Sequence, residues 1–161
     1  MKSKTNIKLD LTTAEQKGLR ANKIKYSEIA DYMIDDLCLL LDISETRAKE
    51  IRAMAEFQSV PSIGIKFAQD LISLGYYSLD ELKDKDGATL TEDLEHSVGA
   101  WIDPCVEDQC RLVVHYANYR DNSKKWWDFT EERKRYRAEN GYPANRPKKA
   151  WFELEKYQNK E

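Results

Sequence analysis

The stretch from Phe57 to Gly75, FQSVPSIGIKFAQDLISLG, constrains the fold of this chain more than any other. Apolar residues recur at helical spacing from Ile65 to Leu74, and Gly75 is a typical helix stop. Pro61 ends the incoming helix, and we expect Gly64 to supply a backbone conformation that a Cβ would resist. The stretch therefore predicts two helices joined by a tight turn.

This turn lies at the start of a helix, where backbone N–H groups lack partners within the helix and the helix dipole adds positive potential. The N–H groups of Gly64, Ile65 and Lys66 are expected to point outward, and Lys66 adds a full charge. An anion such as a nucleic-acid phosphate suits this position. The alternative is a helical corner that only packs or contacts another protein.

The residues VPSIGIK resemble the helix-hairpin-helix motif, in which a glycine, hydrophobic, glycine turn contacts the DNA backbone without reading the sequence. Ser62 stands where the motif has its first glycine, so a side chain occupies a place that the motif keeps bare. The resemblance implies nucleic-acid contacts by Ser62, Ile63, Gly64, Ile65 and Lys66.

A second, degenerate hairpin precedes this one. A shift of about 20 residues aligns LLDISETRAKEI with VPSIGIKFAQDL. Asp42 and Glu45 in the earlier turn would repel a phosphate, so we expect that turn to be structural or to contact protein.

The rest of the chain predicts more helices. Their expected positions are a capped helix from Thr12 to about Leu19, a helix from Ser27 to Leu41 with Met33 on its apolar stripe, one near residues 88–98, and one that starts at Asp103 and Pro104. These patterns predict an all-α fold, with the tandem hairpins inside a small helical bundle. The predicted parts are a polar segment (1–26), a helix-hairpin-helix domain (27–123) and a basic, aromatic C-terminal extension (124–161).

Charge is unevenly distributed. The net charge is −3, yet residues 124–161 hold 11 Lys and Arg against 7 Asp and Glu, which leaves 15 against 22 for residues 1–123. This favours a weak DNA binder, or one restricted to special DNA shapes. The sequence has no run of about 18 apolar residues and no signal-peptide pattern, so we expect a cytoplasmic protein without a membrane partner.

The extension interleaves cations with aromatic residues, a composition that can follow phosphates while stacking bases. The cationic candidates are Arg133, Lys134, Arg135 and Arg137. The alternative places them on a solvated helix. For Trp126, Trp127 and Phe129 we favour a role in anchoring the extension to the domain, because exposed adjacent aromatics are costly.

No metal or cofactor is expected. The three cysteines form no CxxC pair. Cys105, Cys110 and His115 are five residues apart in turn, so on one helix each is rotated by about 140° from the last and they cannot converge on one ion.

The ordered segments VPSIGIKFAQDLISLG, SLDELK, DPCVEDQCRLVVHYA and KKWWDF are similar to the small bacterial helix-hairpin-helix proteins of the "pathogenicity locus" family. The resemblance covers roughly Leu39 to Phe129. It implies non-sequence-specific or structure-specific DNA binding, with a link to DNA repair or processing. The alternative is a protein-interaction adaptor, and the choice between monomer and homodimer stays open.

Catalysis is not expected. Some DNA glycosylases place a lysine in the hairpin and an aspartate after its second helix, and Lys66 and Asp84 have about that separation. However, Asp84 lies in the polar run KDKDG, which offers no apolar pocket for an extruded base. We therefore assign no catalytic residues, and glycosylase-like activity is only a weak alternative.

Overall fold

The computed structural model describes residues 6–154 and is all-α. Within these residues, extended pairing is limited to a single bridge between Trp101 and Ala150. The chain forms two compact units, unit 1 up to Glu81 and unit 2 from Leu82 onward. The division falls inside the predicted domain 27–123, and the described part of the extension belongs to unit 2.

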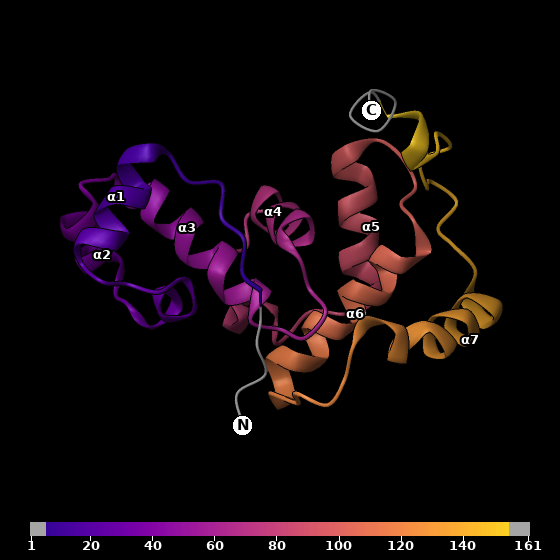
Figure 1. The fold of residues 1–161 in the computed structure, drawn as a ribbon. Helices are drawn as coiled ribbons and strands as arrows, with labels where there is room; N and C mark the ends of the chain where they lie inside the picture. Colours follow the sequence, from indigo (N-terminus) through magenta and orange to yellow (C-terminus); the bar gives the residue numbers. More distant parts are fainter. Residues whose placement is uncertain (1–5, 155–161) are drawn as a thin grey trace. The chain divides into compact units, whose positions relative to one another are not determined.

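Unit 1 is organised around its longest helix. Its elements are α1 (Thr13–Ala21), the 3-10 helix η1 (Tyr26–Asp31), α2 (Ile34–Leu41), α3 (Glu45–Gln58) and α4 (Ile65–Ser73). α3 contacts η1, α2 and α4 (Figure 1). The predicted capping box at α1 is confirmed, since the Thr12 side chain accepts from the Glu15 backbone and Glu15 accepts from the Thr12 N–H.

The single helix predicted from Ser27 to Leu41 is wrong. Tyr32 and Met33 are extended, with ψ of 147° and 150°, and they separate η1 from α2. As a result Met33 is 70% exposed instead of buried in the core, while Leu37 is fully buried.

The segment before α1 lies along α3 and closes the core of unit 1. The buried Gln58 side chain accepts from the Lys8 N–H at 3.0 Å and donates to the Lys8 carbonyl at 2.6 Å. This pairing satisfies a buried amide and places Ile7 in the core beside Ile51.

Unit 2 contains α5 (Gly87–Val98), α6 (Pro104–Tyr119), η3 (Trp126–Phe129), α7 (Thr130–Asn140) and η4 (Trp151–Glu153), and η2 (Leu79–Leu82) ends where the unit begins. α6 packs against α5, η3 and α7. The predicted start of α6 is confirmed, because Asp103 accepts from the Cys105 N–H and Pro104 occupies the first turn.

Candidate nucleic-acid interface

The turn between α3 and α4 alternates exposed and buried residues. Ile63 is 6% exposed and anchors the turn in the core of unit 1. Ser62 and Gly64 on either side of it are exposed, as is Lys66 in the first turn of α4, whereas Ile65 is half-buried. The turn therefore presents its backbone to solvent while a hydrophobic residue holds it in place.

Strain in this turn falls on Ser62, not on Gly64. Ser62 has φ +67°, in the left-handed region that favours glycine, whereas Gly64 has φ −101°. A Cβ added at Gly64 would meet no atom within 4 Å. The expectation that Gly64 needs to be glycine for its conformation is wrong, because the unusual backbone lies two residues earlier.

The two turns of unit 1 share one backbone pattern. Asp42 has φ +53° and lies two residues before Ser44, the residue that caps α3; Ser62 stands in the same relation to Gly64, the residue that precedes α4. The turns differ in capping. Ser44 accepts from the Arg47 N–H at 3.1 Å, whereas Gly64 has no side chain with which to cap α4.

We expect Ser62→Gly to raise the free energy of unfolding by up to about 1 kcal/mol, because glycine adopts a positive φ without the cost that a Cβ brings. Asp42→Gly is the matched control, with a smaller gain because Asp tolerates the left-handed region better. Urea denaturation measures both. A loss of stability in Ser62→Gly would show that the side chain, and not the backbone, determines this position.

The start of α4 can accept an anion. The first backbone bond of this helix runs from the Ala68 N–H to the Gly64 carbonyl, at 3.2 Å, so the N–H groups before Ala68 have no partner within the helix. Within residues 6–154, Lys66 forms no ion pair, and it is exposed at the second position of α4. The helix dipole and the lysine charge both favour a negative group here.

The four cationic candidates of the extension divide into two pairs, all on α7. Arg133 donates to the buried Asp108 at 2.6 Å, and Arg137 donates to the buried Glu107 at 2.9 Å. Burial lowers the pKa of Arg133, but the hydrogen bond to Asp108 and the negative charges of Asp108 and Glu107 together raise it above its ordinary value. Lys134 and Arg135 are exposed. A solvated helix is thus the wrong description for Arg133 and Arg137, whose charges neutralise acids inside unit 2.

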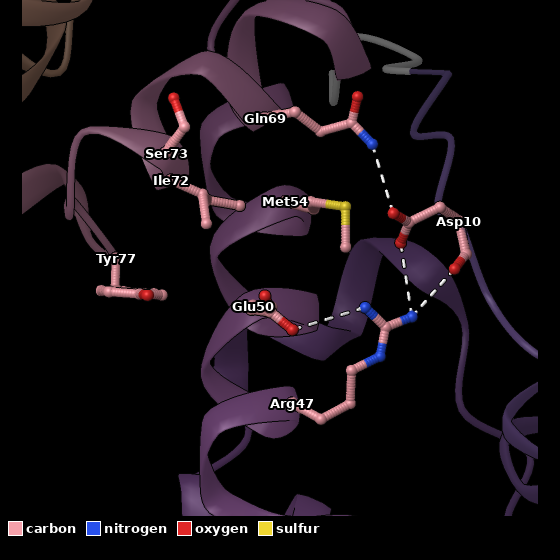
Figure 2. Close-up of a pocket in the computed structure, with 8 residues that line it drawn as sticks. All are labelled: Asp10, Arg47, Glu50, Met54, Gln69, Ile72, Ser73 and Tyr77. Carbon is pink, nitrogen blue, oxygen red and sulfur yellow. Dashed lines mark hydrogen bonds and ion pairs between the residues drawn. The ribbon is translucent and has the colours of Figure 1, made fainter. Parts of the chain in front are cut away.

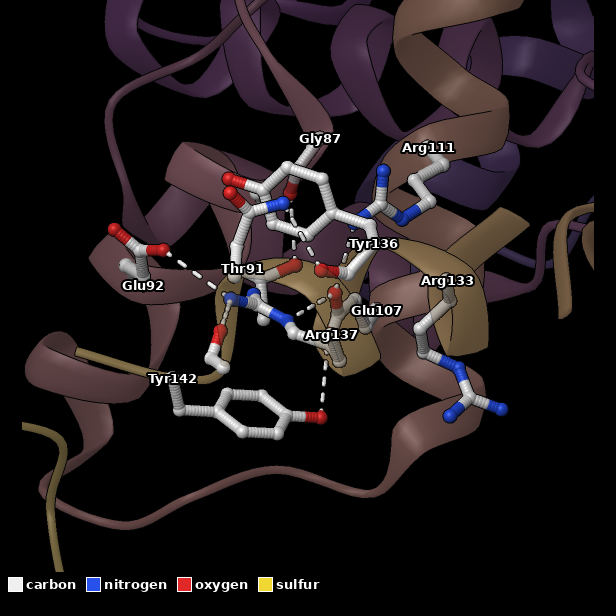
Figure 3. Close-up of polar contacts among 12 residues, drawn as sticks. Gly87, Thr91, Glu92, Glu107, Arg111, Arg133, Tyr136, Arg137 and Tyr142 are labelled. Carbon is white, nitrogen blue, oxygen red and sulfur yellow. Dashed lines mark hydrogen bonds and ion pairs between the residues drawn. The ribbon is translucent and has the colours of Figure 1, made fainter. Parts of the chain in front are cut away.

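These contacts belong to a larger acid and arginine network that sequence reasoning missed. Glu95 and Glu107 are each 1% exposed, and Arg146 donates to Glu95 at 2.9 Å. Figure 3 shows Arg137 between Glu107 and Tyr142. The Tyr142 ring lies 4.1 Å from the Arg137 guanidinium carbon and 3.6 Å from that of Arg146. The extension is therefore held onto α5 and α6 by buried charge pairs.

Unit 1 also contains a pocket of about 390 Å³ formed by α3, α4 and the N-terminal segment. Figure 2 shows the Arg47 guanidinium facing Asp10 and Glu50 across it. Arg47 also donates to Glu15 at 2.9 Å, and this bond lowers the pKa of Glu15. Since two acids, Asp10 and Glu50, line the pocket with one cation, Arg47, the pocket disfavours a phosphate.

The three aromatic residues predicted to anchor the extension differ in burial. Phe129 is 8% exposed and Trp126 is half-buried, but Trp127 is 52% exposed. Trp127 therefore does not anchor the extension.

Metal ligands do not gather in the described part of the chain, where no group of three His, Cys, Asp or Glu side chains is placed to hold an ion. Cys110 is buried and Cys105 exposed, while His115 lies 3.3 Å from Asp121. None of the helices within residues 6–154 is both long and apolar enough to cross a lipid bilayer.

Fold and site together define a small helical protein with an exposed helix start that its N-cap residue, Gly64, cannot cap with a side chain. Residues 50–135 match the family described as Pathogenicity locus. Because the match spans just over half of the 161 residues, the chain belongs to this family. The chain is also similar to the mitomycin resistance protein McrB of Streptomyces lavendulae, at 27% identity over 88 residues, or 55% of this chain and 83% of that protein. No solved structure is significantly similar to this chain.

Proposed function

We propose that the turn between α3 and α4 is a helix-hairpin-helix that binds the phosphate backbone of DNA without reading sequence. The observation that carries the proposal is the start of α4, where Gly64 supplies no side-chain cap and both Gly64 and Lys66 are exposed. A phosphate oxygen accepts from the backbone N–H groups of a helix start and gains from the helix dipole. Because these contacts reach only the backbone, they suit non-sequence-specific or structure-specific binding.

Two further features support the assignment. Ile63 is buried between exposed Ser62 and Gly64, which is the arrangement that a glycine, hydrophobic, glycine turn requires. The repeated positive φ at Asp42 and Ser62 supports tandem hairpins of one origin. The earlier turn is capped by Ser44 and carries Asp42 and Glu45, so we assign phosphate binding to the second turn alone.

The affinity is expected to be low. The net charge of −3 gives little long-range attraction to DNA, and the charges of Arg133 and Arg137 are neutralised inside unit 2. Only Lys134 and Arg135 of the four cationic candidates in the extension remain part of the proposal.

The charge reversal Lys66→Glu tests this function. We expect it to weaken duplex binding about tenfold or more at low salt, because it replaces a phosphate contact with repulsion. Fluorescence anisotropy of a labelled duplex measures the change. Lys17→Glu, an equal charge reversal at an exposed position of α1, is the control and should have a much smaller effect. If both variants lose the same affinity for the duplex, Lys66 acts only through the net charge of the protein and does not contact a phosphate.

A second candidate function is that of a protein-interaction adaptor. The observation that favours it is the exposure of large apolar side chains in unit 1, where Met33 is 70% and Leu39 is 82% exposed. The same titration decides between the two functions: absence of duplex binding even at low salt removes the first and leaves the adaptor.

A further inference from the structure

Unit 2 carries a second surface that the proposed function does not use. It is the corner where the end of α6 meets η3, and its exposed aromatic and cationic residues are Tyr119, Arg120, Lys124, Lys125 and Trp127. We call it the α6–η3 corner. The two exposed rings are large: Tyr119 is 72% and Trp127 52% exposed.

Both rings are braced by neighbours. Trp127 packs edge-on against Trp126 with ring centroids 5.3 Å apart, and Tyr119 lies 4.9 Å from the His115 ring. His115 in turn lies 5.4 Å from the buried Phe129, which fixes η3 on α6. Because neighbouring rings already restrict Trp127 and Tyr119, these side chains lose less conformational entropy when a partner stacks on them.

One cation lies over the Trp127 ring, and two more are near in sequence. The Lys125 ammonium lies 6.0 Å from the centre of the Trp127 ring, and Lys124 and Arg120 are exposed close by in sequence. The two carboxylates of the corner are engaged in local bonds. Asp121 accepts from the Ser123 N–H at 2.9 Å and lies beside His115, and Asp128 accepts from the Lys125 N–H at 2.8 Å.

We propose that the α6–η3 corner binds single-stranded nucleic acid, with bases stacked on Trp127 and Tyr119 and phosphates held by Lys124, Lys125 and Arg120. Exposed rings next to cations are the two requirements of such a site. The bases of a duplex are already stacked on one another, so the partner must offer unpaired bases. This inference goes beyond duplex binding by the α3–α4 turn and does not rest on it.

The test is fluorescence anisotropy of two labelled single strands, oligothymidylate and oligouridylate, which separates DNA from RNA as the source. We expect Trp127→Ala to weaken binding of the preferred strand by about 5- to 150-fold, the range for loss of one stacked base. Tyr119→Ala should weaken it in the same direction, and Trp127→Phe should restore much of the affinity. Circular dichroism confirms folding, which the half-exposed Trp127 should not affect.

Two controls distinguish this site from the α3–α4 turn. Phe152→Ala removes another exposed aromatic of unit 2, at 55% exposure, and should leave the affinity unchanged. Lys66→Glu should weaken duplex binding while retaining single-strand binding. The inference is overturned if the wild-type protein binds neither strand at low salt, or if Trp127→Ala and Tyr119→Ala bind as well as the wild type. Binding to anionic vesicles but to neither strand would overturn it in favour of a membrane surface.

Discussion

Arg146→Ala is expected to lower the free energy of unfolding by about 3–5 kcal/mol, the cost of leaving a buried charge without its partner. Glu95 is 1% exposed and accepts from both Nε and Nη2 of Arg146. It also accepts from the Ile102 N–H at 2.9 Å, so it cannot turn out to solvent without losing that bond. All four tryptophans of the chain lie in unit 2, so tryptophan fluorescence during urea denaturation reports on this unit.

Two further variants separate the charge effect from lost packing. Glu95→Gln combined with Arg146→Ala should recover much of the stability, because the amide keeps an acceptor for Ile102 without a buried charge. Arg135→Ala removes an exposed arginine of α7 and should change stability by less than about 0.5 kcal/mol. A loss of under about 1 kcal/mol in Arg146→Ala would show that the Glu95 carboxylate is not buried as described.

Gly87→Ala should also destabilise unit 2, by about 1–3 kcal/mol or more, through overpacking between α5 and α6. A Cβ at Gly87 would lie 2.6 Å from Cγ and 3.0 Å from Cα of Arg111. Arg111 is 8% exposed and bonded to Glu107 at 3.1 Å, so neither its backbone nor its side chain can move aside cheaply. The same fluorescence denaturation measures the change. The control is Ser97→Ala, at an exposed position of α5. Equal stability of the two variants would mean that α5 and α6 can move apart without lowering the free energy of unfolding.

Local signals in the sequence predicted much of the fold. Capping residues marked the starts of α1 and α6, since Thr12 and Asp103 each accept a backbone N–H of the helix that follows. These interactions lie within one turn of the chain, so sequence spacing reveals them.

Other features depend on contacts that spacing does not reveal. No proline or glycine marks the break between η1 and α2, so a continuous helix was the natural prediction. Glu95 and Arg146 are 51 residues apart in the sequence. No residue near Glu95 in the sequence indicates that its side chain is buried. The pair Glu107 and Arg111 has the i, i+4 spacing of a helical ion pair and could have been found from sequence.

The candidate site was predictable in position but not in detail. The resemblance placed the exposed turn at residues 62–66, and Ser62 at the motif's glycine position was the signal for its positive φ. The sequence did not reveal that Arg133 and Arg137 pair with Asp108 and Glu107, because these partners are on α6, 25 and 30 residues earlier. Composition alone does not separate a solvated cation from one that neutralises a buried acid.

The most direct test of DNA binding by the α3–α4 turn is a backbone amide NMR titration of the labelled protein with a short duplex. We predict the largest chemical-shift changes at the amides of Gly64, Ile65 and Lys66, with no comparable change at Ser44, Glu45 and Thr46 in the equivalent earlier turn. If the amide chemical shifts of residues 64–66 stay constant while those of other residues change on adding the duplex, the assignment of this turn as the phosphate site is contradicted.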